Sequence, residues 1–189
     1  GDTLIRFRLE LIRRFIERGY EVHAFAPEIS AKFLAEFSAE GAQFHYIQFQ
    51  RKSVGLLNTV ISIYDIVTKL RKINPAIVFS YTHKSVVVGS ICSWIAGINH
   101  SYSLVTGTGH IFDQDTLKKK ISRLMGIFGF RLAFMANHKV FFQNPDDLSL
   151  FGRLCSLKKS KSILVNGSGV DLDLFSLQPL PDEPIFICL

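Results

Sequence analysis

Cysteine is scarce in this chain, and its few cysteines share no metal-binding spacing. Among 189 residues there are three, Cys92, Cys155 and Cys188. A zinc site built from cysteine pairs needs two of them within a few residues, so the sequence excludes that class. An odd number of widely separated cysteines indicates reduced, buried thiols rather than a disulfide framework, and we therefore expect a cytoplasmic protein.

Long apolar runs are also missing. The longest stretch without Asp, Glu, Lys or Arg covers 85–112, and Asn99, His100 and three glycines interrupt it. A membrane-spanning helix needs about 20 consecutive apolar residues, so this stretch predicts a buried helix, a turn and a strand. The opening residues, with Asp2 and Arg6, are too polar for a signal peptide.

Acidic residues are outnumbered by basic ones, 16 against 22, which gives a net charge of +6. Such an excess suits an anionic partner, either a phosphate-bearing ligand or an anionic membrane face. Ordinary surface charge is the alternative explanation. With 48% hydrophobic residues, 17 of them Phe in a chain of this length, the sequence can bury the core of one domain.

What the chain does contain is an alternation of helical and strand-like segments. Hydrophobic spacing predicts helices over 3–18, 30–40, 56–70, 85–96 and 116–137, and strands over 22–26, 44–49, 76–81, 101–105, 140–142 and 163–165. This alternation is typical of an α/β fold, a Rossmann-like three-layer sandwich with a mostly parallel sheet. Because the pattern begins on a helix, we expect a first strand and its glycine-rich turn upstream of residue 1.

The carboxyl ends of two strands carry polar residues, and ligands bind at such ends in parallel sheets. Gln143 and Asn144 follow one strand. Asn144 can cap a helix that begins at Pro145, and Asp146 and Asp147 then suit its first turn better than a metal or acid-base site. After the next strand come Asn166, Gly167, Ser168, Gly169 and Asp171, a turn with side-chain hydrogen-bonding groups. We expect both segments to face a ligand cleft.

Two more loops follow strands. Thr82, His83, Lys84 and Ser85 would bring hydroxyls, an imidazole, an ammonium and helix amides together, which is typical of an anion or sugar site. The alternative is a capping hydroxyl beside a solvated Lys84. The second loop holds Gly107, Thr108, Gly109 and His110. Because imidazole titrates near neutrality, His110 is a candidate catalytic residue, although a lone loop histidine is more often structural.

The end of the chain changes composition. Three prolines in 176–184 indicate a linker, and the apolar run 185–189 that follows it begins a strand of another domain. We therefore predict one domain over 1–175, a linker over 176–184, and the first strand of a second domain over 185–189.

The motif Phe141-Phe142-Gln143-Asn144-x-Asp146-Asp147, followed by Gly167-Ser168-Gly169-Val170-Asp171, resembles the end of the N-terminal domain of family 4 retaining glycosyltransferases of the GT-B fold. The run from Thr82 to Ser85, then Gly89 and the glycine loop at 107–109, is similar to the branch that elongates polyprenyl-diphosphate-linked saccharides. His83 stands where that branch usually has proline, and Thr108 stands where it has leucine.

The resemblance implies an acceptor-binding half that is inactive by itself. It implies transfer of a sugar from a nucleotide sugar, held by the second domain, to a lipid-linked saccharide in bacterial capsule, lipopolysaccharide or glycan synthesis. The acceptor would bind at Thr82–Ser85 and Gly107–His110, without a cofactor, a metal or nucleic acid. It also implies a location in the cytoplasm, with peripheral attachment to the inner face of the cytoplasmic membrane as the finer expectation.

Two other functions fit the pattern less well. One is a Rossmann-like module that binds a phosphorylated ligand without chemistry, and the other is half of a UDP-sugar epimerase. A dehydrogenase is disfavoured because no Gly-x-Gly-x-x-Gly follows a strand.

The helix expected over 116–137 carries a basic face: Lys118, Lys119, Lys120, Arg123 and Arg131. With exposed aromatic residues beside it, this helix would bind an anionic membrane. The alternative is a helix that packs on the sheet through Leu124, Phe128 and Leu132, with its lysines in water.

Overall fold

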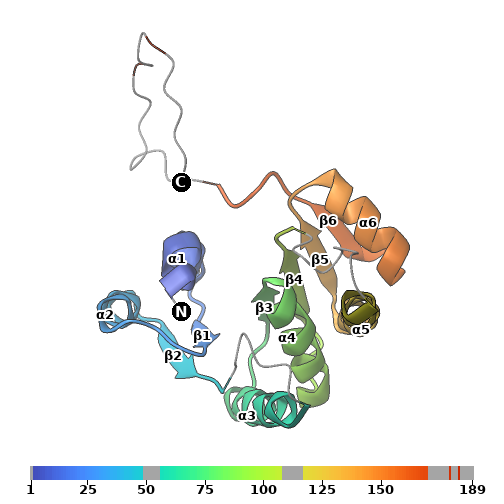
Figure 1. Ribbon diagram of the computed structural model, residues 1–189. Helices are drawn as coiled ribbons and strands as arrows, with labels where there is room; N and C mark the ends of the chain where they lie inside the picture. The colour runs from blue at the N-terminus through green and yellow to red at the C-terminus, as the bar shows by residue number, and fades with distance from the viewer. Residues whose placement is uncertain (1, 49–55, 108–116, 170–178, 180–182, 184–189) are drawn as a thin grey trace.

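A computed structural model of the protein describes residues 2–48, 56–107, 117–169, 179 and 183. Helices and strands alternate as the sequence predicts (Figure 1). The elements are α1 (Asp2–Glu17), β1 (His23–Ala26), α2 (Ala31–Ala39), β2 (Gln43–Tyr46), α3 (Leu56–Ile73), β3 (Val78–Tyr81), α4 (His83–Ala96), β4 (Ser101–Val105), α5 (Leu117–Ala136), β5 (Lys139–Phe142), α6 (Pro145–Cys155), a short 3-10 turn (Lys159–Lys161) and β6 (Ser162–Leu164). The predicted linker and second-domain strand lie outside the described residues, apart from 179 and 183.

All the strand pairs are parallel, which confirms the α/β class, but the described strands form two sheets instead of one. β1 pairs with β2, and β3, β4, β5 and β6 follow one another in the second sheet. β1 and β3 are not hydrogen-bonded to each other, so each is an edge of its own sheet. Figure 1 shows α1, α2 and the small sheet on one side, and β3 to β6 with α4, α5 and α6 on the other.

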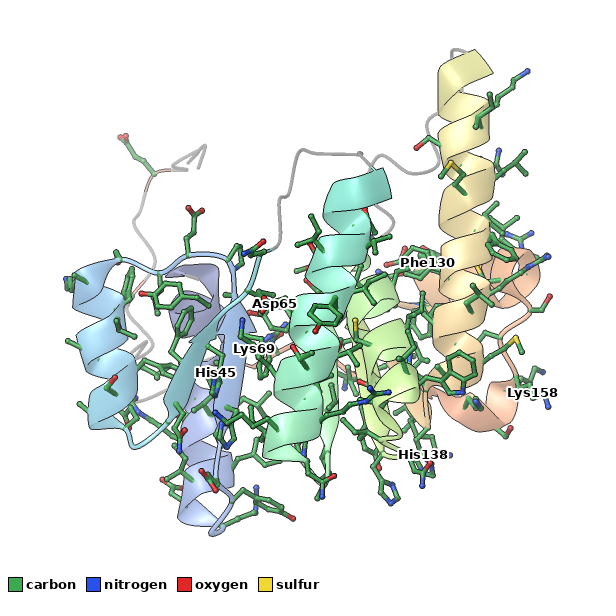
Figure 2. All side chains as sticks on the ribbon, turned by 90° about the horizontal axis from the view of Figure 1, so that it is seen from below. His45, Asp65, Lys69, Phe130, His138 and Lys158 are labelled. Atoms are coloured by element: carbon green, nitrogen blue, oxygen red, sulfur yellow. The ribbon has the colours of Figure 1, made fainter. Side chains whose placement is uncertain are left out.

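The larger sheet is covered on one face by α4, α5 and α6. Phe130 of α5 (labelled in Figure 2) and Phe151 of α6 are fully buried, with ring centroids 4.9 Å apart, and they pack with Phe142 of β5. A second cluster, formed mainly by α3 and α4, contacts Phe25 of β1 and Val78 of β3. The two sheets therefore pack against the same helices although they share no hydrogen bonds.

A buried polar network joins α4, β4 and the end of α5. The Asn137 amide nitrogen donates to Ser90 Oγ at 3.0 Å and to Ser103 Oγ at 2.9 Å. The Ser101 hydroxyl donates to the Asn137 side-chain oxygen at 3.0 Å. All four residues are essentially inaccessible to solvent, so the cost of burying them is offset by complete hydrogen bonding. Hydrophobic periodicity gave no sign of this network.

The packing of α5 corrects one expectation from the sequence. Leu124 and Phe128 are 67% and 63% exposed, and Leu132 is 39% exposed. The helix packs instead through Phe130, Ala133 and Phe134. The alternative of a helix held on the sheet by Leu124, Phe128 and Leu132 is therefore wrong, because these residues lie on the opposite side of α5 from the core. None of the described helices is both long and apolar enough to span a bilayer.

Candidate functional site

The loops that were expected to bind ligands share one edge of the larger sheet. Because β3 to β6 are parallel neighbours, the segments after β3, β4, β5 and β6 all leave at the carboxyl edge. Residues 82–85, 106–107, 143–144 and 165–169 are the described parts of these segments. Thr108, Gly109, His110 and Asp171 lie outside the described residues, so their expected roles stay predictions.

The loop after β3 has a strained backbone. Thr82 precedes α4 with φ 68° and ψ 150°, a conformation that a β-branched residue rarely adopts. The Thr82 hydroxyl makes no cap bond to the helix amides and lies 3.2 Å from Ser85 Oγ. The sequence predicted a helix that begins at Ser85, but α4 begins at His83. The Thr82 carbonyl oxygen already accepts the first helical hydrogen bond, from the Val86 amide. Such strain is found most often at functional sites.

His83 joins this loop to the next one. Its Nε2 atom lies 2.5 Å from the Gly107 carbonyl oxygen, which Gly107 presents with a φ of 116°. The imidazole ring also packs edge-on against Phe130, with centroids 6.2 Å apart. Two segments separated by a helix and a strand are thereby held together. The predicted acceptor residues His83 and Gly107 are therefore neighbours in space, and their binding role stays a prediction.

The segments after β5 and β6 also meet. The Gln143 side-chain nitrogen donates to Ser168 Oγ at 2.9 Å, and Ser168 lies between Gly167 and Gly169, whose φ angles are 93° and 72°. Positive φ at both flanking positions favours glycine. Asn166 is exposed.

Asn144 has a structural role at this edge. Its side-chain oxygen accepts from the Asp147 amide at 2.7 Å, and its nitrogen donates to the Asp147 carboxylate at 2.7 Å. Pro145 occupies the first turn of α6, as predicted. The capping role expected for Asn144 is confirmed, and the same bonds occupy the side chain that was also predicted to face the cleft.

Arg8 was not among the predicted site residues, yet it contacts both the end of β3 and the segment after β6. Its Nη1 atom donates to Ser168 Oγ at 2.7 Å, and its guanidinium carbon lies 4.9 Å from the centre of the Tyr81 ring. The side chain is only 8% exposed. Burial lowers the pKa of Arg8, and attraction to Tyr81 partly opposes this. The signal was in the spacing, because Arg8 precedes the buried Ile12 by four residues and so lies on the same side of α1.

The described residues contain no group of three or more potential metal ligands. Cys92 and Cys155 are free and buried, and burial raises the pKa of Cys92 to about 12 and that of Cys155 to about 11, where Arg131 partly opposes it. These two thiols are therefore free and buried, as the sequence predicted.

Comparisons with known proteins agree with the motifs. No protein-family model matches the chain. A Campylobacter jejuni protein named N,N'-diacetylbacillosaminyl-diphospho-undecaprenol alpha-1,3-N-acetylgalactosaminyltransferase is 23% identical over 175 residues, which cover 93% of this chain and 46% of that protein. MurG of Acinetobacter baumannii has a similar structure, with a TM-score of 0.52 at 10% identity, over 86% of this chain and 41% of MurG.

The chain thus spans about half the length of each relative. The likeness to MurG confirms the Rossmann-like α/β fold, as one half of a GT-B architecture. The Campylobacter protein is a glycosyltransferase, and its name states that the acceptor is a lipid-linked saccharide. The resemblance that the motifs of this chain indicated is therefore confirmed.

Proposed function

We propose that this chain is the acceptor-binding half of a retaining glycosyltransferase that extends a lipid-linked saccharide. The observation that carries the proposal is the contact between His83 and Gly107. It assembles, at the carboxyl edge of a parallel sheet, the two loops whose motifs resemble the polyprenyl-diphosphate branch. The Campylobacter relative, which is named for an undecaprenol-linked acceptor, supports the same substrate class. Neither a binding module nor an epimerase gains support from a specific contact.

The nucleotide sugar would be held by a second domain, with this chain forming the facing wall of the cleft. We expect the reaction to need no metal, because the leaving diphosphate would be stabilised by side chains. The test is transfer by the full-length protein from a panel of UDP-sugars to a polyprenyl-diphosphate-linked saccharide, in buffer with EDTA. No transfer to any such acceptor, while a soluble sugar is accepted, would contradict the substrate class.

Lys84 lies in the first turn of α4, next to His83. A helix start together with an ammonium group suits the diphosphate of the acceptor. Lys84→Ala in the full-length protein should therefore raise KM for the acceptor about tenfold and leave KM for the donor unchanged. Lys32→Ala, on the exposed side of α2, is the matched control. Equal effects of Lys84→Ala on both substrates would remove Lys84 from the acceptor site.

Helix α5 would hold the cleft at the membrane surface. Its outer side exposes an apolar stripe that consists of Ile121, Leu124, Met125, Phe128, Leu132 and Met135. These positions recur at helical spacing along one side of α5. The helix has no acidic residue but contains Lys118, Lys119, Lys120, Arg123 and Arg131, which complement anionic lipids at about 1 kcal/mol for each residue near the surface.

Liposome co-sedimentation tests this attachment. Binding to phosphatidylglycerol vesicles should fall as salt is raised, and should fall further in the variant with Lys118, Lys119 and Lys120 changed to Glu. The double variant Leu124→Ser with Phe128→Ser should lose binding even at low salt. Tyr64→Ser is the control, because Tyr64 is 71% exposed on α3, away from the stripe. If all the variants sediment like the unchanged protein, α5 is not the membrane surface.

The open sheet edges also fit the predicted domain organisation. Phe25 of β1 and Val78 of β3 pack against one cluster while their strands remain unpaired with each other. A parallel strand from upstream of α1, placed between them, would join the two sheets into one. Hydrogen exchange tests this: the β1 and β3 amides should exchange more slowly in a chain extended at its amino end than in this one.

A further inference from the structure

Arg8 is a buried cation without an acidic partner among the described residues. Its contacts are the hydrogen bond to Ser168 Oγ and the face of the Tyr81 ring. The Nε atom is buried and has no hydrogen-bond partner in the part of the chain that the structure describes. The residue as a whole is only 8% exposed.

The neighbouring arginines on α1 are arranged differently. Arg13 reaches Glu40 at 2.6 Å, and Arg14 reaches Glu10 at 2.8 Å. Both of these arginines are partly exposed, so water shares the stabilisation of their charge. Arg8 is only 8% exposed and has no carboxylate partner among the described residues. A charge that is buried without compensation is costly, and proteins keep one where a ligand supplies the counter-charge.

The groups around Arg8 are donors. Ser168 Oγ accepts one hydrogen bond from Arg8 and another from Gln143, so both lone pairs of the hydroxyl are used and its proton remains to be donated. Gln143 Nε2 has a second hydrogen. Arg8 presents a planar fork of donors, of which Nε is still unused. The Ser168 hydroxyl joins the Arg8 guanidinium to the Gln143 amide, and a cation with two neutral donors beside it is a combination that binds an oxyanion.

We propose that Arg8, with Ser168 and Gln143, binds a phosphate oxyanion of a substrate diphosphate at the carboxyl edge of the sheet. The inference deepens the proposed function and rests on it for the identity of the substrate. The anion is common to a nucleotide sugar and to a polyprenyl-diphosphate carrier, and Arg8 contacts residues on both sides of the edge. Binding would give the guanidinium its counter-charge and would hold α1 against the segment that follows β6.

Titration of the full-length protein with pyrophosphate, by calorimetry, is the first test. Arg8→Gln should weaken pyrophosphate binding at least tenfold, and Arg8→Lys should restore part of it, because Lys keeps the charge but not the planar fork. Arg14→Gln is the control, on the same helix but in an exposed ion pair, and should bind like the unchanged protein. If Arg8→Gln binds pyrophosphate normally, or if the unchanged protein does not bind it, the proposal is wrong.

Thermal unfolding separates ligand binding from a structural role. Without anion, Arg8→Gln should melt at the same temperature as the unchanged protein or higher, because the substitution removes a buried charge that has no carboxylate partner among the described residues. Pyrophosphate should raise the melting temperature of the unchanged protein only. A variant that melts lower without anion, and that still responds to pyrophosphate, would show that Arg8 is structural and would overturn the proposal.

The source of the anion is decided by parallel titrations with UDP and with farnesyl diphosphate. The ligand whose affinity falls in Arg8→Gln identifies the substrate that Arg8 holds, and a fall for neither would contradict the proposal. Because these titrations need no sugar transfer, they stand apart from the proposed function. A protein that binds pyrophosphate through Arg8 but transfers no sugar would contradict the transferase alone.

Discussion

Asn137 and Arg8 are both buried polar residues, and their surroundings differ in one respect. Asn137 lies inside the larger core, 1% exposed, where both its amide nitrogen and its oxygen have serine partners. Arg8 lies at the edge of the sheet, 8% exposed, with its Nε unpartnered within the described residues. Each polar atom of the Asn137 side chain has a hydrogen-bond partner, whereas Arg8 Nε has none within the described residues. A buried polar side chain whose atoms all have hydrogen-bond partners, such as Asn137, therefore has a structural role. A buried polar side chain with an atom that has no partner, such as Arg8, is a candidate for ligand binding.

The largest effect is expected at the satisfied site. Asn137→Ala removes three hydrogen bonds. It takes away the acceptor of the buried Ser101 hydroxyl and leaves Ser103 with Ser90 as its side-chain partner. We expect a loss of about 3 kcal/mol in the free energy of unfolding, measured by urea denaturation. Asn166→Ala, at an exposed asparagine, should change stability by less than about 0.5 kcal/mol. If Asn137→Ala were as stable as Asn166→Ala, the hydrogen bonds of Asn137 would not stabilise the fold, and the contrast with Arg8 would be wrong.

Close packing of α4 on β3 gives the next largest effect. A Cβ added at Gly89 would overlap Ser80 Oγ and lie 3.2 Å from Ser80 Cβ. Gly89→Ala should therefore destabilise the protein by about 1–3 kcal/mol. Gly152→Ala in α6 is the matched control, because a Cβ there meets nothing within 4 Å and alanine is the better helix former by about 1 kcal/mol. Equal thermal shifts for the two variants would show that α4 can move away from the sheet.

The smallest effect concerns the half-buried pair His23 and His45, whose hydrogen bond depends on pH. His23 Nδ1 and His45 Nε2 lie 2.8 Å apart, a hydrogen bond that needs one unprotonated nitrogen. Burial, then the His23 ring, then Lys69 and Lys72 lower the pKa of His45. Lys69 itself is paired with Asp65 of α3, and Figure 2 labels these two residues and His45.

A histidine with a lowered pKa takes up its proton more readily in the unfolded chain. The unprotonated His45 therefore adds to the free energy of unfolding above the ordinary histidine pKa, and this contribution is lost as the pH falls below about 6.5. We expect a loss of less than about 1 kcal/mol between pH 7.5 and 5.5, measured by urea unfolding at both pH values. His45→Gln, which does not titrate, should lose less over the same interval. A pH dependence unchanged by His45→Gln would assign the titration to another group.

Much of the fold could be predicted from the sequence because it depends on local patterns. Hydrophobic spacing located α3 and β4, and the Asn144-Pro145 pair gave the start of α6 by chemistry contained in four residues. The loops that hold His83 and Gly107 were predicted to lie at the same edge of the sheet because each follows a parallel strand. Local patterns could not say which side of α5 faces the core, since that helix is apolar on both sides. They also could not locate α4's start at His83, which required the unusual backbone of Thr82.

The sequence by itself determined the parallel α/β class, the order of the elements and the loops that end at one edge, because periodicity and glycine or proline positions act within a few residues. Only the tertiary structure decided that Asn137 is satisfied by serines from α4 and β4, that the strands divide between two sheets, and that Arg8 lies against Tyr81 and Ser168. Arg8 and Ser168 are 160 positions apart. Their hydrogen bond depends on how α1 packs beside the larger sheet, and no local pattern of either segment contains that information.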